Sequence, residues 1–211
     1  MSNLDPEANV LYASADTLHP STWETLARRA PGEAAAAAGA SWDGVAFRLE
    51  LLGHPLRVEP GARRLSFSAG PARGVGYQRA LVAVTYLARA LPVDPRGDWV
   101  TFRELPGGDG FFRGPHSLNT PQLERCFGSA PGTLEAAAAA LGGCSCSGGD
   151  VAVELQALPR LPVRVLLWAG TDEFPPSASL LTDPRAHLHL PLDVLWALTN
   201  VLIADLTRRV T

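Results

Sequence analysis

The stretch VRVLLWAGTDEFPPSASLLTD, residues 163–183, contains two mainly apolar runs separated by a short polar break. In a strand, successive side chains point to opposite faces, and residues 163–168 are largely apolar on both faces. Such a strand is typical of the centre of a sheet. Gly170 ends the run, and Pro175 and Pro176 cannot continue the hydrogen-bonded ladder. The stretch therefore predicts two buried strands joined by a connection outside the sheet.

The rest of the chain mixes strands and helices without regular alternation. Three short runs between Gly44 and Phe67, separated by glycine and proline, predict an antiparallel meander. Residues 75–91 predict a helix with Tyr77, Leu81, Val84, Ala88 and Leu91 on one face. Further helices are expected at residues 21–30, 119–128 and 132–143, and residues 31–41 are expected to form an alanine helix or a short linker. Further strands are expected at 150–158, with a candidate strand at 186–190. This mixture predicts an α+β fold with a mostly antiparallel sheet that is flanked by helices.

The segment LPLDVLWALTNVLIADL, residues 190–206, predicts a buried C-terminal helix. It is interrupted by Asp193, Asn200 and Asp205 and is shorter than the roughly 20 clean apolar residues that a bilayer requires. In the first turn, the Asp193 carboxylate is expected to stabilise free backbone N–H groups. We expect Asn200 to be buried and hydrogen-bonded to a neighbouring loop.

The composition indicates a globular protein that can bury a core, since 46% of its 211 residues are hydrophobic and 18% are charged. We expect an irregular segment at residues 1–20 and a single domain at residues 21–211. The net charge of −3 is too mild for a nucleic-acid surface. We find no secretory signal or membrane span, and expect a cytoplasmic location. All 18 basic residues are arginine, which excludes lysine nucleophiles.

Asp172 and Glu173 occupy the polar break between the two strands. One interpretation is a solvated turn, because turns favour such residues. The other is a carboxylate pair that a rigid scaffold presents for recognition, since loops often carry function. If a cation such as Arg164 or Arg103 lies close, the two acids would instead form a structural clamp.

His187 and His189 are candidate metal ligands, because on a strand they share one face. Two imidazoles in this arrangement can bind Zn or Fe when one or two carboxylates complete the site. A His-x-His pair alone lacks the three or four ligands that a site needs.

The cysteines, Cys126, Cys144 and Cys146, are too few for an ordinary iron–sulfur cluster. A disulfide within the Cys-x-Cys pair would be strained. We interpret residues 142–149 as a glycine–serine loop that carries two thiols, with a redox or metal role as the alternative. The glycine-rich residues 106–110 lack the spacing of a phosphate-binding loop.

Four segments together resemble a known bacterial and archaeal family, the domain of unknown function 3786. They are FRELPGG (102–108), GGDVAVELQALPRLPVRVLLWAG (148–170), DEFPPSASLL (172–181) and HLPLDVLWAL (189–198). The resemblance implies no reaction, because the family has none assigned. Carried over residue by residue, it marks Arg103, Gly107, Gly108, Asp150, Trp168, Asp172, Glu173, Phe174, Asp183 and Asp193.

The resemblance also suggests a metabolic context. Members of the family are similar to proteins of anaerobes, and some of them carry an iron–sulfur domain beside this domain. We therefore expect a binding or accessory module that holds a cofactor, or docks on an iron–sulfur or corrinoid metalloprotein of anaerobic metabolism. The cofactor-binding candidates are Arg103, Gly107, Gly108, Trp168, Asp172, Glu173 and Asp183. The alternative is a metal-dependent enzyme with His187 and His189 as ligands and Asp172 or Glu173 as ligand or general base. The binding module is favoured, because no complete catalytic constellation can be assembled from the sequence.

Overall fold

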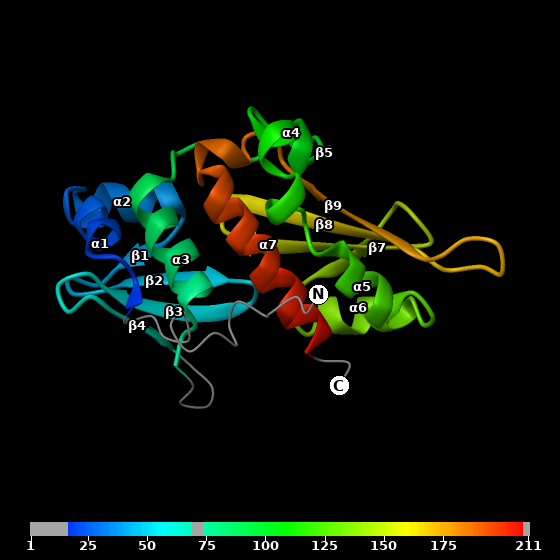
Figure 1. The fold of residues 1–211 in the computed structure, drawn as a ribbon. Coiled ribbons are helices and arrows are strands. Elements are labelled where there is room, and N and C mark those ends of the chain that lie inside the picture. Colours follow the sequence, from blue (N-terminus) through cyan, green and yellow to red (C-terminus); the bar gives the residue numbers. More distant parts are fainter. Residues whose placement is uncertain (1–16, 69–73, 209–211) are drawn as a thin grey trace.

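The computed structural model describes residues 17–68 and 74–208, which form two antiparallel sheets with helices packed around them (Figure 1). The helices are α1 (Pro20–Ala27), α2 (Pro31–Ala38), α3 (Tyr77–Arg89), α4 (Gly108–Phe111), α5 (Thr120–Phe127), α6 (Gly132–Ala139) and α7 (Leu192–Thr207), with 3-10 helices η3 (Phe102–Glu104), η4 (Gly114–His116) and η5 (Ala186–Leu188). The strands are β1 (Ser41–Trp42), β2 (Phe47–Leu51), β3 (His54–Glu59), β4 (Arg64–Phe67), β5 (Val100–Thr101), β6 (Cys144–Cys146), β7 (Val151–Leu158), β8 (Leu161–Trp168) and β9 (Ser177–Thr182). The predicted α+β class is confirmed.

The smaller sheet has the strand order β1-β2-β3-β4, so the predicted meander of residues 44–67 is confirmed, with β1 as an added strand. Along β2, Phe47, Leu49 and Leu51 are buried and alternate with exposed residues, as the two-residue period of a strand requires. Helices α1 to α3 lie over one face of this sheet (Figure 1).

Charged residues of this sheet and of the β1–β2 loop form a chain of ion pairs. The Asp43 carboxylate lies 2.8 Å from Arg57 and 3.4 Å from Arg48, and Glu59 lies 3.2 Å from Arg57 and 2.6 Å from Arg64. Each acid therefore bridges two arginines, which ties the β1–β2 loop and strands β2, β3 and β4 together.

The larger sheet has the order β5-β9-β8-β7-β6, with every neighbouring pair antiparallel. The predicted central strand, β8, lies in the middle, and Val163, Val165 and Leu167 are fully buried. The cysteine segment is corrected, because Cys144–Cys146 form the edge strand β6 and not a loop.

The predicted strand at residues 186–190 is wrong, since these residues form η5 and the turn that follows it. The N–H groups of Ala186, Leu188 and His189 donate to carbonyl groups three residues earlier, at 2.9–3.0 Å. Because these donors are used within the turn, they cannot pair with a neighbouring strand.

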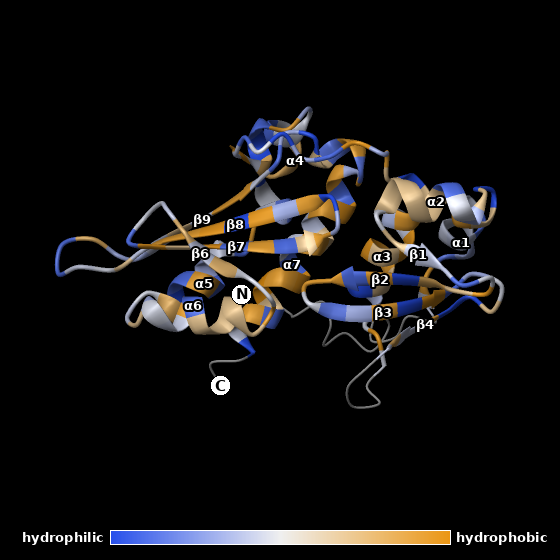
Figure 2. Cartoon of the chain, turned by 180° about the vertical axis from the view of Figure 1, so that it is seen from behind, coloured by the Kyte–Doolittle hydropathy of each residue, from blue (hydrophilic) through white to orange (hydrophobic). Residues whose placement is uncertain are grey.

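The predicted buried C-terminal helix is confirmed as α7. The side chains of Leu195, Leu198, Leu202 and Leu206 are fully buried, and α7 packs against α3, α5 and α6. Figure 2 shows the apolar character that α7 shares with the strands of the larger sheet. One contiguous cluster of buried side chains includes residues of both sheets and of α7. The expectation for Asn200 is wrong, because its buried amide nitrogen has no hydrogen-bond partner within the described residues.

The helix α3 is also confirmed, but its buried surface is wider than the single face that was predicted. Nine of its residues are buried, including Gln78 and Arg79, so nearly the whole helix surface is covered. The helix ends at Arg89, and Leu91 lies beyond it with 42% of its surface exposed.

Within residues 17–68 and 74–208, no helix has both the length and the apolar character needed to cross a membrane.

We predict that Leu195→Ala or Leu202→Ala each lowers the free energy of unfolding by about 2–5 kcal/mol, because each change leaves a cavity in a fully buried site. Urea melts measure the loss. Leu91→Ala, at an exposed site of the same residue type, serves as the control and should change stability by less than about 0.5 kcal/mol. Losses below about 1 kcal/mol for both core variants would contradict a central role for α7.

We predict a pH-dependent effect of Asp43→Asn. The amide of Ala46 first, and then the guanidinium of Arg57, hold the pKa of the Asp43 carboxyl well below its usual range. Because the folded-state pKa is the lower one, this stabilisation is present above about pH 4 and is lost as the pH falls below that value. The variant should have a lower urea midpoint than the parent at neutral pH, and the difference should shrink steadily in acid. A difference that stays constant down to about pH 3 would show that the carboxylate charge is not its source.

Candidate functional site

The structure places the predicted site residues in three separate groups. Arg103, Gly107 and Gly108 belong to the η3–α4 segment beside β9, and Trp168, Asp172 and Glu173 lie at the turn between β8 and β9. Asp183, His187 and His189 follow β9 at its other end. Strand β9 has six residues, so about 20 Å of extended chain separates the second group from the third.

The second group forms the end of a long hairpin that projects beyond the helices (Figure 1). We call residues 168–176 the hairpin tip. The tip is closed by Thr171, whose N–H donates to the Phe174 carbonyl at 2.8 Å. The Thr171 hydroxyl accepts from the backbone N–H groups of Glu173 at 3.3 Å and Phe174 at 3.1 Å. The backbone of the tip is therefore held by its own hydrogen bonds.

The side chains of Asp172, Glu173 and Phe174, in contrast, make no hydrogen bond or ion pair within the described part of the chain. Neither Asp172 nor Glu173 forms an ion pair there. The suggested clamp partners are engaged elsewhere: Arg164 lies 2.9 Å from Glu154, and Arg103 lies 2.7 Å from Asp109. The clamp interpretation is thus wrong.

Two large apolar side chains are exposed beside these acids. Phe174 is 69% exposed and Trp168 is 40% exposed. Few large hydrophobic side chains in the described residues are as exposed as Phe174. The tip therefore combines a fixed backbone with uncovered aromatic and acidic side chains.

Asp150 supports the tip from the neighbouring turn. Its carboxylate accepts from the Ala169 N–H at 2.9 Å, and its own N–H donates to the Leu167 carbonyl at 2.9 Å. The preceding Gly149 has a φ of 58°, and a Cβ there would lie 2.7 Å from the Leu167 oxygen. The Gly-Asp pair of the family segment thus fixes the end of β8.

In the third group, Asp183 stabilises the backbone. Its buried carboxylate accepts from the backbone N–H groups of Arg96 at 2.5 Å, Gly97 at 3.1 Å and Arg185 at 2.9 Å. It therefore joins the loop before β5 to the turn after β9.

The two histidines do not share a face, because they lie on a 3-10 turn. His187 Nδ1 is 2.8 Å from the Pro184 carbonyl oxygen. His189 is 1% exposed, with its ring centroid 6.1 Å from that of Tyr86, and its nitrogens make no hydrogen bond of normal geometry within the described residues. Burial first, and then the charge of Arg160, lower the pKa of His189, opposed by Asp183 and the Val93 backbone.

A metal site is not assembled in the described residues, where no group of three or more His, Cys, Asp or Glu is placed to hold an ion. The hairpin tip that carries Asp172 and Glu173 lies at the opposite end of β9 from His187 and His189. Cys126, Cys144 and Cys146 are free thiols on α5 and β6.

The first group is built on a tight turn. Thr101 and Glu104 form a reciprocal capping box around η3, with the Thr101 N–H and hydroxyl each donating to Glu104 at 2.7 Å. Gly107 has a φ of 77°, which favours glycine. Gly108 packs so closely that a Cβ would lie 2.2 Å from the Phe102 carbonyl oxygen. Both glycines are therefore required by the backbone.

The side chain of Arg103 extends from this turn and lies near that of a second arginine. Asp109 lies 2.7 Å from Arg103 and 2.5 Å from Arg113, and these guanidinium groups, Arg103 first, lower the pKa of its carboxyl. The three side chains together carry one excess positive charge. The sequence alone offered no signal for this trio, because Asp109 stands in a glycine-rich stretch without a recognisable motif.

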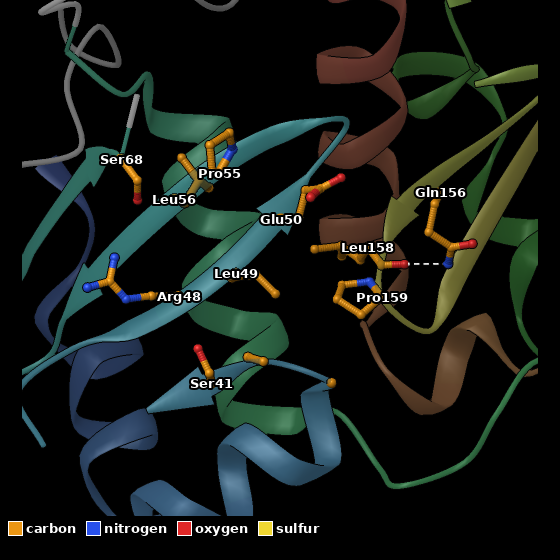
Figure 3. A pocket seen from close by; sticks show the side chains of 12 residues that line it. Ser41, Arg48, Leu49, Glu50, Pro55, Leu56, Ser68, Gln156, Leu158 and Pro159 are labelled. Carbon is orange, nitrogen blue, oxygen red and sulfur yellow. Dashed lines mark hydrogen bonds between the residues drawn. The ribbon is translucent and has the colours of Figure 1, made fainter. Parts of the chain in front are cut away.

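Among the hollows on the surface of the described residues, two are considered in detail. One, of about 610 Å³, lies on the smaller sheet beside the β7–β8 turn, where Arg48 and Glu50 line it and the Gln156 amide donates to the Leu158 carbonyl at 2.7 Å (Figure 3). The other, of about 630 Å³, lies between η3, residues 112–120 and β9, and Arg103 lines it. We call the second hollow the Arg103 groove.

Over residues 30–205 the chain matches the family described as Domain of unknown function (DUF3786). The chain belongs to this family. Neither a curated protein nor a solved structure matches it. The part matched to DUF3786 contains both the Arg103 groove and the hairpin tip.

We predict that Gly108→Ala lowers the free energy of unfolding by at least about 1 kcal/mol, because its Cβ would collide with the Phe102 carbonyl. Gly110, in the same helix, has no atom within 4 Å of an added Cβ. Gly110→Ala is therefore the matched control and should leave stability unchanged or raise it by up to about 1 kcal/mol. Equal stabilities of the two variants in urea melts would show that the turn does not require Gly108.

Proposed function

We propose that this DUF3786 chain is a binding module that docks on a partner protein through the hairpin tip. The observation that carries the proposal is the 69% exposure of Phe174 next to two carboxylates without ion pairs, on a backbone that is held in place. The fold does not require these side chains to be exposed, whereas recognition of a partner does.

The aromatic side chains supply the area that such docking needs. Aromatic residues are enriched at the centres of interfaces, where one or two of them carry much of the binding free energy. Phe174 stands at the end of the hairpin, and Trp168 lies where the tip begins, opposite Ser177. A partner with an apolar pocket would cover Phe174 and pack along Trp168.

The charges indicate the kind of surface that surrounds this pocket. Asp172, Glu173 and the exposed Asp150 are all acidic, and none forms an ion pair with another described residue. Carboxylates in this arrangement favour a basic partner surface and accelerate association with it. The expected partner site is an apolar pocket with a basic rim.

The family setting suggests a metalloprotein of iron–sulfur or corrinoid type as the partner, with the cofactor held by that protein. Such a centre absorbs visible light, so the spectrum of a complex isolated without oxygen tests this assignment separately. The enzyme alternative receives less support, because β9 lies between the acids and the histidines that it requires.

We predict that the double variant Asp172→Asn, Glu173→Gln keeps a melting temperature within a few degrees of the parent and weakens partner binding at least about tenfold, roughly 1.4 kcal/mol. Phe174→Ser should weaken binding as well. The partner is identified by affinity capture from the native organism with quantitative mass spectrometry, then purified, and its affinity is measured by titration.

The exposed acid Glu50 on the smaller sheet provides the control, and Glu50→Gln should bind like the parent. Unchanged partner binding in the double variant and in Phe174→Ser would leave a solvated turn as the correct description. A large drop in melting temperature would assign the acids to the fold.

A further inference from the structure

The Arg103 groove has an apolar wall and a polar rim. Phe102 and Phe112, which meet edge to face at 5.7 Å between centroids, form its buried floor together with Leu180, and the half-buried Leu118 and Ala178 form the apolar wall. On the rim lie Arg103 and the hydroxyl-bearing Ser117 and Ser179. The volume of about 630 Å³ lies within the range of about 300–1,000 Å³ that is typical of small-molecule sites.

The rim has a cation whose side chain is only partly occupied. Arg103 and Arg113 share the single carboxylate of Asp109, and the Glu104 carboxylate accepts from Thr101 on the same rim. The Arg103 guanidinium is half exposed and uses only its Nη2 in that ion pair. Its other N–H groups are free to donate to an anion, and its planar shape suits a carboxylate.

The hydroxyl groups of the rim are also available. Within residues 17–68 and 74–208, the side chains of Ser117, Thr120 and Ser179 make no hydrogen bond to protein. Hydroxyl groups can donate to or accept from a ligand by rotation. The groove therefore offers directed polar contacts beside the charged group.

We propose that the Arg103 groove binds a small organic carboxylate with an aromatic or branched apolar body. The carboxylate pairs with Arg103 and the hydroxyl groups, and the body packs against Leu118 and Ala178. The carboxylates of Glu104 and Asp109 lie close to this single exposed guanidinium, so the groove suits one carboxylate better than a polyphosphate. This site is separate from the hairpin tip, so the ligand and the docking partner are independent proposals.

The test uses phenylacetate as the probe and the full chain labelled for ¹H–¹⁵N NMR, with 2-phenylethanol as an uncharged probe of similar size. We expect saturable shifts of residues 101–103, 117–120 and 178–180 with phenylacetate at up to about 10 mM, a range that detects millimolar complexes. The apparent Kd for 2-phenylethanol should be at least tenfold higher. Absent shifts, shifts centred on another surface, or equal binding of both probes would overturn the proposal.

Variants test separately the contribution of the Arg103 charge and that of the open volume of the groove. Arg103→Gln should raise the Kd for phenylacetate at least tenfold, whereas Arg48→Gln, in the hollow of Figure 3, should leave it unchanged. Ser179→Phe, which fills the groove without touching the arginines' ion pairs, should abolish the shifts and provides a second test if Arg103→Gln does not fold. Parent-like binding in either groove variant would overturn the site. The Asp172→Asn, Glu173→Gln variant should bind phenylacetate normally, which separates a failure here from a failure of docking.

Discussion

Asp205, near the end of α7, is 5% exposed and accepts from Arg79 of α3 through both carboxylate oxygens, each 2.7 Å from Nη2. His54, in the β2–β3 hairpin, lies 3.6 Å from the same carboxylate. Two buried charges lose their hydration, and only close pairing offsets that cost. A slide of α7 along α3 would leave both groups uncompensated, so the pair fixes the relative position of the two helices. Because α3 covers the smaller sheet and α7 contacts α5 and α6 of the other half, the arrangement of the two sheets depends on this contact.

A second set of contacts joins the sheets directly at one end of β7 and β8. The N–H of Leu52 donates to the Ala157 carbonyl at 3.0 Å, beside the register shift between Gln156 and Leu158. Gly53 packs against the Leu141 carbonyl so closely that a Cβ would lie 2.5 Å from its oxygen. The Leu52 hydrogen bond therefore anchors the end of β7 to the smaller sheet, and Gly53 places the same β2–β3 turn against the segment after α6. The opposite end of β8 leads into the hairpin tip, so the fold holds the long hairpin firmly at its base and leaves its far end uncovered.

The elements of the fold follow from local patterns, and the sequence was sufficient for most of them. The two-residue period of residues 44–67 and the doubly apolar run of 163–168 predicted strands that the structure contains. The edge strand β6 was missed, because glycine and serine next to Cys144 and Cys146 resemble a loop, although the segment pairs with β7 in a hairpin. The His-x-His segment was misjudged for a related reason. Alternation suggested a strand, but Asp183 accepts from the Arg185 N–H and starts a turn.

The candidate site was less accessible to sequence reasoning, because it depends on distances between segments far apart in the chain. Nothing in the local pattern shows that Asp109 holds Arg103 and Arg113, or that β9 forms one side of their groove. The structure also divides the family positions by physical role. Gly107, Gly108, Asp150 and Asp183 satisfy backbone geometry or backbone donors, which accounts for them without a ligand. Asp193 lies in the first turn of α7, where its charge is favourable for the helix dipole. Arg103, Trp168, Asp172, Glu173 and Phe174 remain. Their charges and apolar surface face solvent although the fold requires neither, and function is therefore best sought at the groove and the tip that present them.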